Sequence, residues 1–491
     1  MQETINLSNH LIESVKNHDQ NKIALKDDVS CLYYKDIESN IKTFAQRLLD
    51  HKVMPGDKVG MLFGDSIEWC IGFFAVLYVG ANPVLLSPRV PANNISSMLK
   101  SCCARFLLYS KAEIDLKDYD LHPNLVPIEK ELILQPGPKA TNYYNFNPDE
   151  ISLWCCSSGT SGKGQRFVLH RHQNMFKAID INIKMHSIDN NSVIFSTPKL
   201  SFQYGLMNMI YGLIQGGTVI LSSKMPVRQN VCGAVKENNV THLYTTPGIL
   251  ASMIKIDRPT NDLKSVSHVV CGGETLPKLV ENKFKELYSK DIFNGIGMAE
   301  ILTWATSQNP NNKKPGTIGI PLDHVTYEVR NKETGEICNP YEYGELYVLH
   351  PSVALMYWNF AEHTKETFVK GWFKTNDIVY KDDDGFLVYV CRSDDMMKIN
   401  GSYVNPIELE EQILQHPSIE ECIVTSKNNQ FDLPEILTNI ILVEGVTLEP
   451  GDVRKFLSGK IENHMIPKHI NFVTEIPRTV TTKKIRSLAR E

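Results

Sequence analysis

The chain has 491 residues, of which 42% are hydrophobic and 22% are charged, and its formal net charge is −5 at pH 7. This length exceeds what one hydrophobic core usually serves, so two or more domains are expected in an ordinary globular protein. The small negative charge gives no reason to expect a nucleic acid or an anionic membrane as a partner.

The N-terminal residues contain neither a basic start nor an apolar stretch, and no later window reaches the length of a membrane span. A cytoplasmic protein without a membrane span is therefore expected. The eleven cysteines are scattered, with adjacent pairs at Cys102-Cys103 and Cys155-Cys156 and no C-x-x-C spacing. They suggest neither a zinc site nor a disulfide framework, so buried reduced thiols are expected.

The first 110 residues alternate between predicted helices and strands, which indicates an α/β layer. An amphipathic helix after residue 8 is followed by a hairpin over residues 23–34. The further elements are helices over 37–49, 67–79 and 92–102, and strands over 58–63, 82–86 and 104–109.

The alternation resumes after residue 170. The predicted elements are helices over 174–185, 207–214, 227–237 and 276–288, and strands over 192–196, 218–222 and 241–245. Two further strands end in Gly272-Gly273-Glu274 and in Gly297-Met298-Ala299-Glu300. Because ligands of open α/β sheets bind beyond the carboxyl ends of the strands, these two ends are candidate site segments.

From about Lys313 the pattern changes to shorter β segments, including a strand over 344–349 and a hairpin over 378–390. The charged segment Arg392-Ser393-Asp394-Asp395 places a domain boundary there, giving domains 1–392 and 393–491. In the second, Asn405, Pro406 and Glu408 predict the start of a helix that runs to about 415. Strands over 422–426, 439–443 and 469–473 and a helix over 450–464 complete an α+β domain.

One glycine-rich loop, residues 157–166, lies between two apolar, β-prone runs, Ile151–Cys156 and Phe167–Leu169. Successive N–H groups in such a loop form a concave anion site that serine and threonine hydroxyls can line. It is not a P-loop, because no Lys-Ser/Thr follows its last glycine and a strand follows instead of a helix. Taken alone, the pattern fits a phosphate site and a surface turn equally well.

Six segments resemble, in order and spacing, the core motifs of the adenylate-forming superfamily. They are residues 157–162, 272–274, 297–300, 371–377, 392–401 and 477–486. Within this superfamily the chain looks closest to benzoate–CoA ligases, on residues 196–206, 295–297 and 394–406. The resemblance implies a large N-terminal α/β domain with a β-rich subdomain, and a small mobile C-terminal domain. It also implies that an acid and MgATP give acyl-AMP and pyrophosphate, after which a thiol takes the acyl group.

The resemblance implies an ATP site shared by several motifs. The loop would hold the β- and γ-phosphates, Gly272–Glu274 would flank the adenine, and Asp377 would accept hydrogen bonds from both ribose hydroxyls. Arg392 would support the ribose or a phosphate through its planar guanidinium. Outside the family, these residues would be read as turn or linker residues. The implied ATP and AMP ligands are Ser157, Ser158, Gly159, Thr160, Ser161, Gly162, Gly272, Gly273, Glu274, Asp377 and Arg392.

Two residues would be catalytic by this resemblance. Glu300 would be a hard oxygen ligand for Mg²⁺, and Lys483 would bridge the acid carboxylate and the α-phosphate oxygens as negative charge builds up. In isolation, Glu300 is equally a solvated loop acid, and Lys483, beside Lys484 and Arg486, is equally part of a basic tail.

The resemblance also implies where the acid and the thiol would bind. The acid would be recognised by apolar or small residues that fit an aryl or short acyl group, namely Phe202, Tyr204, Gly295, Ile296, Gly297 and Thr303. Asp394 would be the hinge of the small domain. Lys398 and Gly401 would face the thiol tunnel, where glycine allows a close approach of the pantetheine arm.

Three positions depart from the family pattern. Gly164-Gln165-Arg166 stands where the family loop continues Pro-Lys-Gly, so either Gln165 or, after a one-residue shift, Arg166 replaces the lysine. Ala299 replaces a threonine that contacts the α-phosphate, and Asn376 replaces a glycine. Losing one charge-assisted phosphate contact costs about 1.5–3 kcal/mol, which slows adenylation without abolishing it.

The sequence therefore predicts an enzyme that uses ATP, Mg²⁺ and coenzyme A on a small, benzoate-like carboxylic acid, as a monomer or homodimer. Two alternatives stay open: an adenylation enzyme that loads the phosphopantetheine arm of a carrier protein, and a degenerate member that binds nucleotide with weak activity. CoA and a carrier arm present the same thiol, so the sequence does not separate them.

Overall fold

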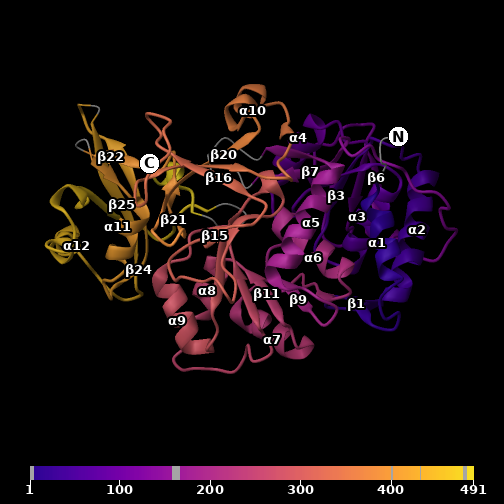
Figure 1. Ribbon diagram of the computed structural model, residues 1–491, viewed down its shortest axis with the longest axis horizontal. Helices are drawn as coiled ribbons and strands as arrows, with labels where there is room; N and C mark the ends of the chain where they lie inside the picture. The colour runs from indigo at the N-terminus through magenta and orange to yellow at the C-terminus, as the bar shows by residue number, and fades with distance from the viewer. Residues whose placement is uncertain (1–4, 158–165, 400–401, 432, 479–483, 491) are drawn as a thin grey trace. The chain divides into compact units, whose positions relative to one another are not determined.

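The computed structural model describes residues 5–157, 166–399, 402–431, 433–478 and 484–490 (Figure 1). The chain forms two compact units. The first comprises Met1–Ser157, Arg166–Thr326 and Leu349–Gly371, and the second includes Tyr327–Val348 and Trp372–Glu491. None of the helices in the described part of the chain combines the length and the apolarity needed to cross a membrane.

One sheet of the first unit has nine strands, and its six central strands run parallel. The register pairs Tyr244 with Val270 and Cys271 with Asn294, so the carboxyl ends of these strands meet at one edge. In spatial order the strands are β15 (Ile320–Pro321), β14 (Trp304–Ser307), β13 (Ile292–Gly297), β12 (His268–Cys271), β11 (His242–Thr245), β9 (Val193–Ser196), β10 (Thr218–Ile220), β1 (Ile23–Lys26) and β2 (Cys31–Tyr33).

The second sheet of this unit has seven strands. Its parallel part ends against the antiparallel β7–β8 hairpin, which carries the glycine-rich loop. In spatial order the strands are β18 (Met356–Tyr357), β8 (Phe167–Arg171), β7 (Ile151–Cys156), β4 (Asn82–Leu85), β3 (Lys58–Leu62), β5 (Phe106–Tyr109) and β6 (Val126–Glu129).

A layer of helices shares one hydrophobic core with both sheets. Its most apolar member is α3, in which every residue except Glu68 is buried, and this explains why its sequence lacks an amphipathic pattern. The helices of this layer are α1 (Leu7–Val15), α2 (Tyr34–Asp50), α3 (Ile67–Tyr78), α5 (His172–His186) and α6 (Gln203–Ile214).

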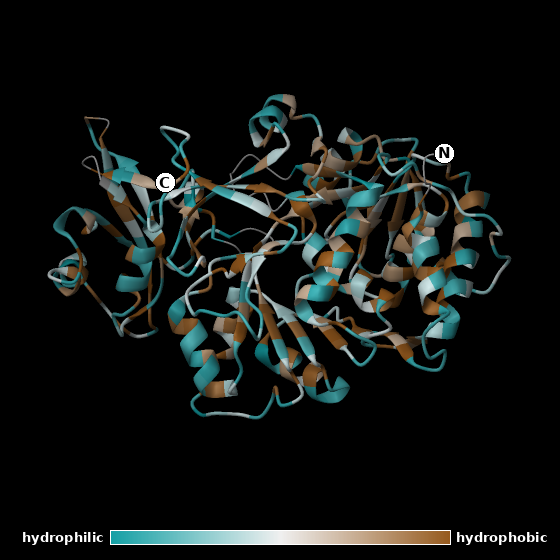
Figure 2. Cartoon of the chain, viewed as in Figure 1, coloured by the Kyte–Doolittle hydropathy of each residue, from teal (hydrophilic) through white to brown (hydrophobic). Residues whose placement is uncertain are grey.

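The other face of the nine-stranded sheet packs against a second core, to which α7 (Arg228–Asn238), α8 (Pro247–Met253) and α9 (Lys278–Tyr288) contribute. In Figure 2 the sheet strands are largely brown, whereas α9 alternates brown and teal as an amphipathic surface helix does. The remaining elements of this unit are α4 (Ala92–Ser101), α10 (Ala361–Thr367), β19 (Phe368–Val369), η1 (Leu116–Asp118), η2 (Lys130–Leu132) and η3 (Ala299–Ile301).

The second unit is built mainly from antiparallel pairs. One sheet joins β16 (Thr326–Arg330), β17 (Gly344–Leu349), β20 (Trp372–Lys381) and β21 (Leu387–Arg392). A hairpin of β22 (Met397–Ile399) and β23 (Ser402–Val404) precedes a three-stranded sheet. That sheet and its helices are β24 (Ile419–Asn428), β25 (Pro434–Leu442), β26 (His469–Phe472), α11 (Pro406–Ile413), α12 (Pro450–Leu457), η4 (Asn463–Met465) and η5 (Arg486–Arg490).

The predicted α/β fold is confirmed, and some boundaries differ. Helix α6 begins at Gln203, four residues earlier than predicted, which places Tyr204 on the helix. Helix α12 ends at Leu457 instead of 464, because the chain turns at Gly459 with a positive φ of 79°. The domain boundary at 392/393 stays a prediction.

Candidate active site

The base of the glycine-rich loop is closed by two hydrogen bonds. The Ser157 N–H donates to the Arg166 carbonyl at 2.9 Å, and the Arg166 N–H donates to the Ser157 hydroxyl oxygen at 3.3 Å. These bonds extend the β7–β8 ladder, whose last pair is Cys156 and Phe167. Ser158, Gly159, Thr160, Ser161 and Gly162 lie outside the described residues, so their phosphate contacts stay predictions.

The Arg166 side chain points to two aromatic rings. Its guanidinium carbon lies 5.1 Å from the Phe360 ring centroid and 6.0 Å from that of Tyr357. Tyr357 in turn donates its hydroxyl to Glu300 Oε1 at 2.7 Å. Arg166 and Glu300 are therefore linked through one tyrosine at the base of the loop. Gln165, the other candidate for the missing lysine, lies outside the described part of the chain.

Glu300 lies in η3, at the end of strand β13, and its backbone is fixed on two sides. Its carbonyl accepts from the Ala354 N–H at 2.7 Å, and the neighbouring Ala299 carbonyl is 2.8 Å from His170 Nε2. Burial lowers the pKa of His170 to about 4, so at neutral pH the ring is uncharged and Nε2 donates its proton to this carbonyl. The position of Glu300 is thus fixed by the end of β13 and by contacts from the segments that contain His170 and Ala354.

The donor set near Glu300 fits Mg²⁺ better than a metal held wholly by the protein. Among the described residues there is no cluster of three or more His, Cys, Asp or Glu side chains that could hold a metal ion. Mg²⁺ is commonly bound by one or two carboxylates together with substrate phosphates and waters. A single carboxylate such as Glu300 suits that mode.

The strand ends at 272–274 and 295–297 surround one buried indole, that of Trp304 on β14. A Cβ at Gly272 would lie 2.4 Å from this ring, and a Cβ at Gly295 would lie 2.9 Å from it. At Gly297 a Cβ would lie 2.6 Å from the Thr303 carbonyl oxygen. These positions need glycine because the neighbouring ring and backbone approach too closely for any side chain.

Tyr204 contacts the Trp304 indole as well. Its ring meets Trp304 edge to face, with centroids 5.2 Å apart, and its hydroxyl donates to the Val270 carbonyl at 3.2 Å. Thr303 is buried and accepts a 2.5 Å hydrogen bond from Asn182.

The structure therefore brings together four of the predicted acid-pocket residues. They are Tyr204, Gly295, Gly297 and Thr303. Phe202 is the N-cap residue of α6, and Ile296 lies on β13 between the two glycines. Trp304 was missed by sequence reasoning, and no local signal marks it, because its position depends on how β14 pairs with β13 in the sheet.

The adenine segment lies where strand β12 ends. The Gly272 N–H donates to the Thr245 carbonyl at 3.4 Å, and Gly273 adopts a φ of 93°. Gly273 thus turns the chain away from the sheet before Glu274. This exposes backbone at a strand end, as the predicted adenine contact requires.

In the second unit, Asp377 and Arg392 are direct cross-strand partners on β20 and β21. Arg392 donates to Asp377 Oδ1 at 2.7 Å and to the Thr375 carbonyl at 2.9 Å. The Asp377 side chain is 5% exposed and that of Arg392 is 40% exposed, so the arginine fixes a buried carboxylate. Asn376 adopts φ 59°, a left-handed conformation that asparagine tolerates better than most residues. Its replacement of the family glycine is therefore conformationally acceptable.

The predicted hinge and tunnel residues lie after this pair. Asp394 is exposed in the turn between β21 and β22. Lys398 is exposed on β22 and pairs with Glu333 at 3.1 Å. Gly401 lies outside the described residues. The hinge and tunnel roles stay predictions.

The C-terminal basic cluster is a packed segment. Lys484 donates to the Cys422 carbonyl at 2.7 Å, and Arg486 forms ion pairs with Glu410 and, at 3.7 Å, with Asp395. Their side chains are only 27% and 11% exposed. Lys483 itself lies outside the described part of the chain. Lys484 is occupied by structural contacts, and the catalytic role of Lys483 stays a prediction.

Comparison with known proteins gives matches over most of the chain. Residues 11–358 match the AMP-binding enzyme family, and residues 408–483 match the AMP-binding enzyme C-terminal domain. A benzoate–CoA ligase of Thauera aromatica is 28% identical over 460 residues, which are 89% of this chain and 86% of that protein.

Two crystal structures are also similar. The anthranilate–CoA ligase AuaEII in complex with anthranoyl-AMP has a TM-score of 0.90 at 25% identity, covering 100% of this chain and 97% of that one. A benzoate–CoA ligase from Burkholderia xenovorans LB400 has a TM-score of 0.86 at 26% identity, covering 99% and 100%.

Proposed function

Since the chain belongs to the AMP-binding enzyme family of ATP-dependent, adenylate-forming acid–CoA ligases, we propose that its substrate is an aromatic or similarly compact carboxylic acid. The similar proteins named above act, by their names, on benzoate and anthranilate. Because these ligases are 25–28% identical to this chain and are named for aromatic acids, aromatic acids are the first class to test.

The proposed reaction has two steps. A carboxylate oxygen of the acid attacks the α-phosphorus of ATP and releases pyrophosphate, and the resulting acyl-AMP then passes its acyl group to the thiol of CoA with loss of AMP. Mg²⁺ held by Glu300 would neutralise phosphate charge. Asp377, oriented by Arg392, would accept from the ribose hydroxyls, and Lys483 would stabilise the charge that develops between carboxylate and α-phosphate.

The observation that carries the proposal is the array at the base of the loop. Arg166, Tyr357 and Glu300 place a guanidinium and a carboxylate on either side of one tyrosine, where residues 157–166 leave and re-enter the sheet. A cation for a phosphate and an oxygen ligand for Mg²⁺ are the two groups that a bound MgATP needs. Arg166 would thereby supply the positive charge that the lysine of the family loop supplies in other members.

The packing around Trp304 supports a compact acid. The indole is 4% exposed and lies against Gly272 and Gly295, so it fills the space beside these two strand ends. A flat, single-ring acid needs less depth than a long or bicyclic one. This favours benzoate-like acids within the proposed class.

Pyrophosphate release with a panel of aryl and alkyl acids, with and without CoA, tests the proposal. We expect release with single-ring aryl acids, and no release with any acid would contradict it. Lys483→Ala should abolish this release while preserving CoA transfer from supplied acyl-AMP, because the lysine acts on the first step. Unchanged release by Lys483→Ala would show that the lysine is misassigned.

A further inference from the structure

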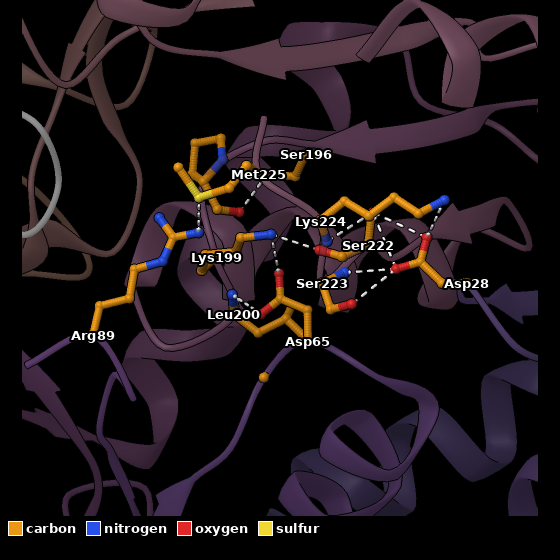
Figure 3. Close-up of polar contacts among 12 residues, drawn as sticks. Asp28, Asp65, Arg89, Ser196, Lys199, Leu200, Ser222, Ser223, Lys224 and Met225 are labelled. Atoms are coloured by element: carbon orange, nitrogen blue, oxygen red, sulfur yellow. Dashed lines mark hydrogen bonds and ion pairs between the residues drawn. The ribbon is translucent and has the colours of Figure 1, made fainter. Parts of the chain in front are cut away.

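The turn between β9 and α6, residues 197–202, is held by a buried ion pair between Lys199 and Asp65 (Figure 3). Lys199 Nζ lies 3.7 Å from Asp65 Oδ2 and donates to the Ser222 carbonyl at 2.5 Å. The Leu200 N–H donates to Asp65 Oδ1 at 3.0 Å. One carboxylate thus binds both the side chain and the backbone of the turn.

The contacts of this pair come from different parts of the first unit. Asp65 follows β3 of the seven-stranded sheet, whereas Lys199 and Ser222 follow β9 and β10 of the nine-stranded sheet. Asp28 holds the segment that receives Lys199, since it accepts from the Ser222 hydroxyl at 3.1 Å and from the Ser223 N–H at 2.9 Å (Figure 3). The turn is therefore fixed against both sheets.

The pair is almost removed from water. The side chains of Lys199 and Asp65 are 16% and 7% exposed. Burial raises the pKa of the Asp65 carboxyl, while the Lys199 ammonium, the Leu200 N–H and the Arg89 guanidinium favour its charged form. Replacing a buried ion pair by apolar side chains often leaves stability unchanged, so its presence here needs a reason other than stability.

The turn packs directly on the first turn of α6. The Phe202 N–H donates to the Lys199 carbonyl at 2.9 Å. A Cβ at Gly205 would lie 2.5 Å from the carbonyl oxygens of Pro198 and Lys199, so nothing separates the two backbones. A shift of Lys199 is therefore transmitted to Phe202, the N-cap residue of α6, and to Tyr204 in its first turn, both of which are predicted acid-site residues.

We propose that Lys199 and Asp65 are positioning residues for the acid site, which set the orientation of Phe202 and Tyr204 without touching the substrate. This inference rests on the proposed function for the identity of the site. It assigns no part in ATP binding to the pair, because the loop base at Ser157 and Arg166 has its own hydrogen bonds.

Lys199→Met tests the inference, because methionine keeps much of the side chain's volume and removes its charge. We expect the KM for the acid to rise at least about tenfold while the KM for ATP stays within about twofold, since small displacements of positioning groups cost this much. Asp262→Asn is the matched control: it breaks the ion pair that joins Arg228 of α7 to the segment before β12 in the same unit, and it should leave both constants unchanged.

The double variant Asp65→Asn/Lys199→Met distinguishes the effect of an unpaired buried carboxylate from that of the lost lysine side chain. Asparagine keeps an oxygen for the Leu200 N–H, and both charges are gone, so we expect a smaller rise in the acid KM than in Lys199→Met alone. Should Lys199→Met fail to fold, Lys199→Arg, which keeps the charge but alters its reach, takes its place with the same expectation. An unchanged acid KM, or equal rises in both KM values, would overturn the inference.

A failure of the proposed function can be told apart from a failure of this inference. If the wild-type protein releases no pyrophosphate with any acid, the proposed function fails. Amide hydrogen exchange then tests the pair itself: residues 197–204 should exchange faster in Lys199→Met than in the wild type and in Asp262→Asn. Equal exchange in the three proteins would overturn the positioning role.

Discussion

We expect ATP binding to depend strongly on Arg166. Its guanidinium lies over Phe360 and Tyr357, and Tyr357 bonds to Glu300. Arg166→Ala should raise the KM for ATP roughly 10- to 100-fold, since a hydrogen bond to a charged group contributes about 1.5–3 kcal/mol. The KM for ATP of Arg166→Lys, which keeps the charge, should lie between those of the wild type and Arg166→Ala.

Steady-state kinetics with ATP varied at saturating acid measures this effect. Phe360→Leu serves as the control, because it removes the ring beneath the guanidinium and leaves the charge in place. An ATP KM that is unchanged in Arg166→Ala would show that Arg166 does not replace the loop lysine.

We expect Trp304 to limit the size of the acid. Trp304→Leu removes most of the indole beside Gly272 and Gly295 and should admit larger acids. We expect the ratio of kcat/KM for a bicyclic aryl acid to that for benzoate to rise about tenfold or more, in the range that one extra hydrophobic group contributes. Competition between the two acids measures this ratio directly, and an unchanged ratio would remove Trp304 from the acid site.

At the scale of secondary structure elements, buried histidines couple stability to pH. His170 on β8 has its pKa lowered to about 4 by burial, against about 6.5 in the unfolded chain. Below pH 6.5 the unfolded state binds a proton that the folded state does not, so stability falls as the pH drops from about 6.5 toward 4. His242 and His350, with pKa values also lowered to about 4 by burial, add to the same trend.

His170→Gln tests this coupling, because the glutamine amide can still donate to the Ala299 carbonyl and does not titrate. Between pH 7.5 and 5.0 the wild type should lose about 2 kcal/mol more unfolding free energy than the variant. Urea titrations at the two pH values measure the difference. The same loss in both proteins would mean that His170 is not the group that titrates.

Local sequence patterns predicted correctly those helices and strands whose bounds depend on neighbouring residues alone. The start of α11 is an example, since the Asn405 side chain accepts from the Ile407 N–H as its cap position predicts. The alternation of strands and helices in the first unit was likewise readable from apolar periodicity. Helix α8 was missed because its seven residues, opened by Pro247, are too few to show a period.

Contacts between distant segments could not be predicted in this way. Tyr357 and Glu300 are 57 residues apart, and neither has a local pattern that points to the other. The family motifs marked Glu300 and Asp377 as predicted site residues. They did not reveal Tyr357, Trp304 or the Lys199–Asp65 pair, because those positions are set by how strands and loops pack in three dimensions.

In the molecule as a whole, the predicted site residues are distributed over two compact units. The first holds the base of the loop, Glu300 and the Trp304 region, and the second holds the Asp377–Arg392 pair and the C-terminal segment around Lys484. Two-step reactions of this kind need different groups in each step. The proposed hinge at Asp394 would allow the second unit's small domain to serve both.

Mass spectrometry of the products formed from ATP, Mg²⁺, CoA and a mixture of aryl and alkyl acids tests both the ligase activity and the proposed class of acid. We predict one dominant acyl-CoA, derived from a single-ring aryl acid, together with AMP in equal amount, and neither product in Glu300→Gln. Formation of acyl-CoA only from long alkyl acids would contradict the compact aromatic assignment, and absence of any acyl-CoA would contradict the ligase itself.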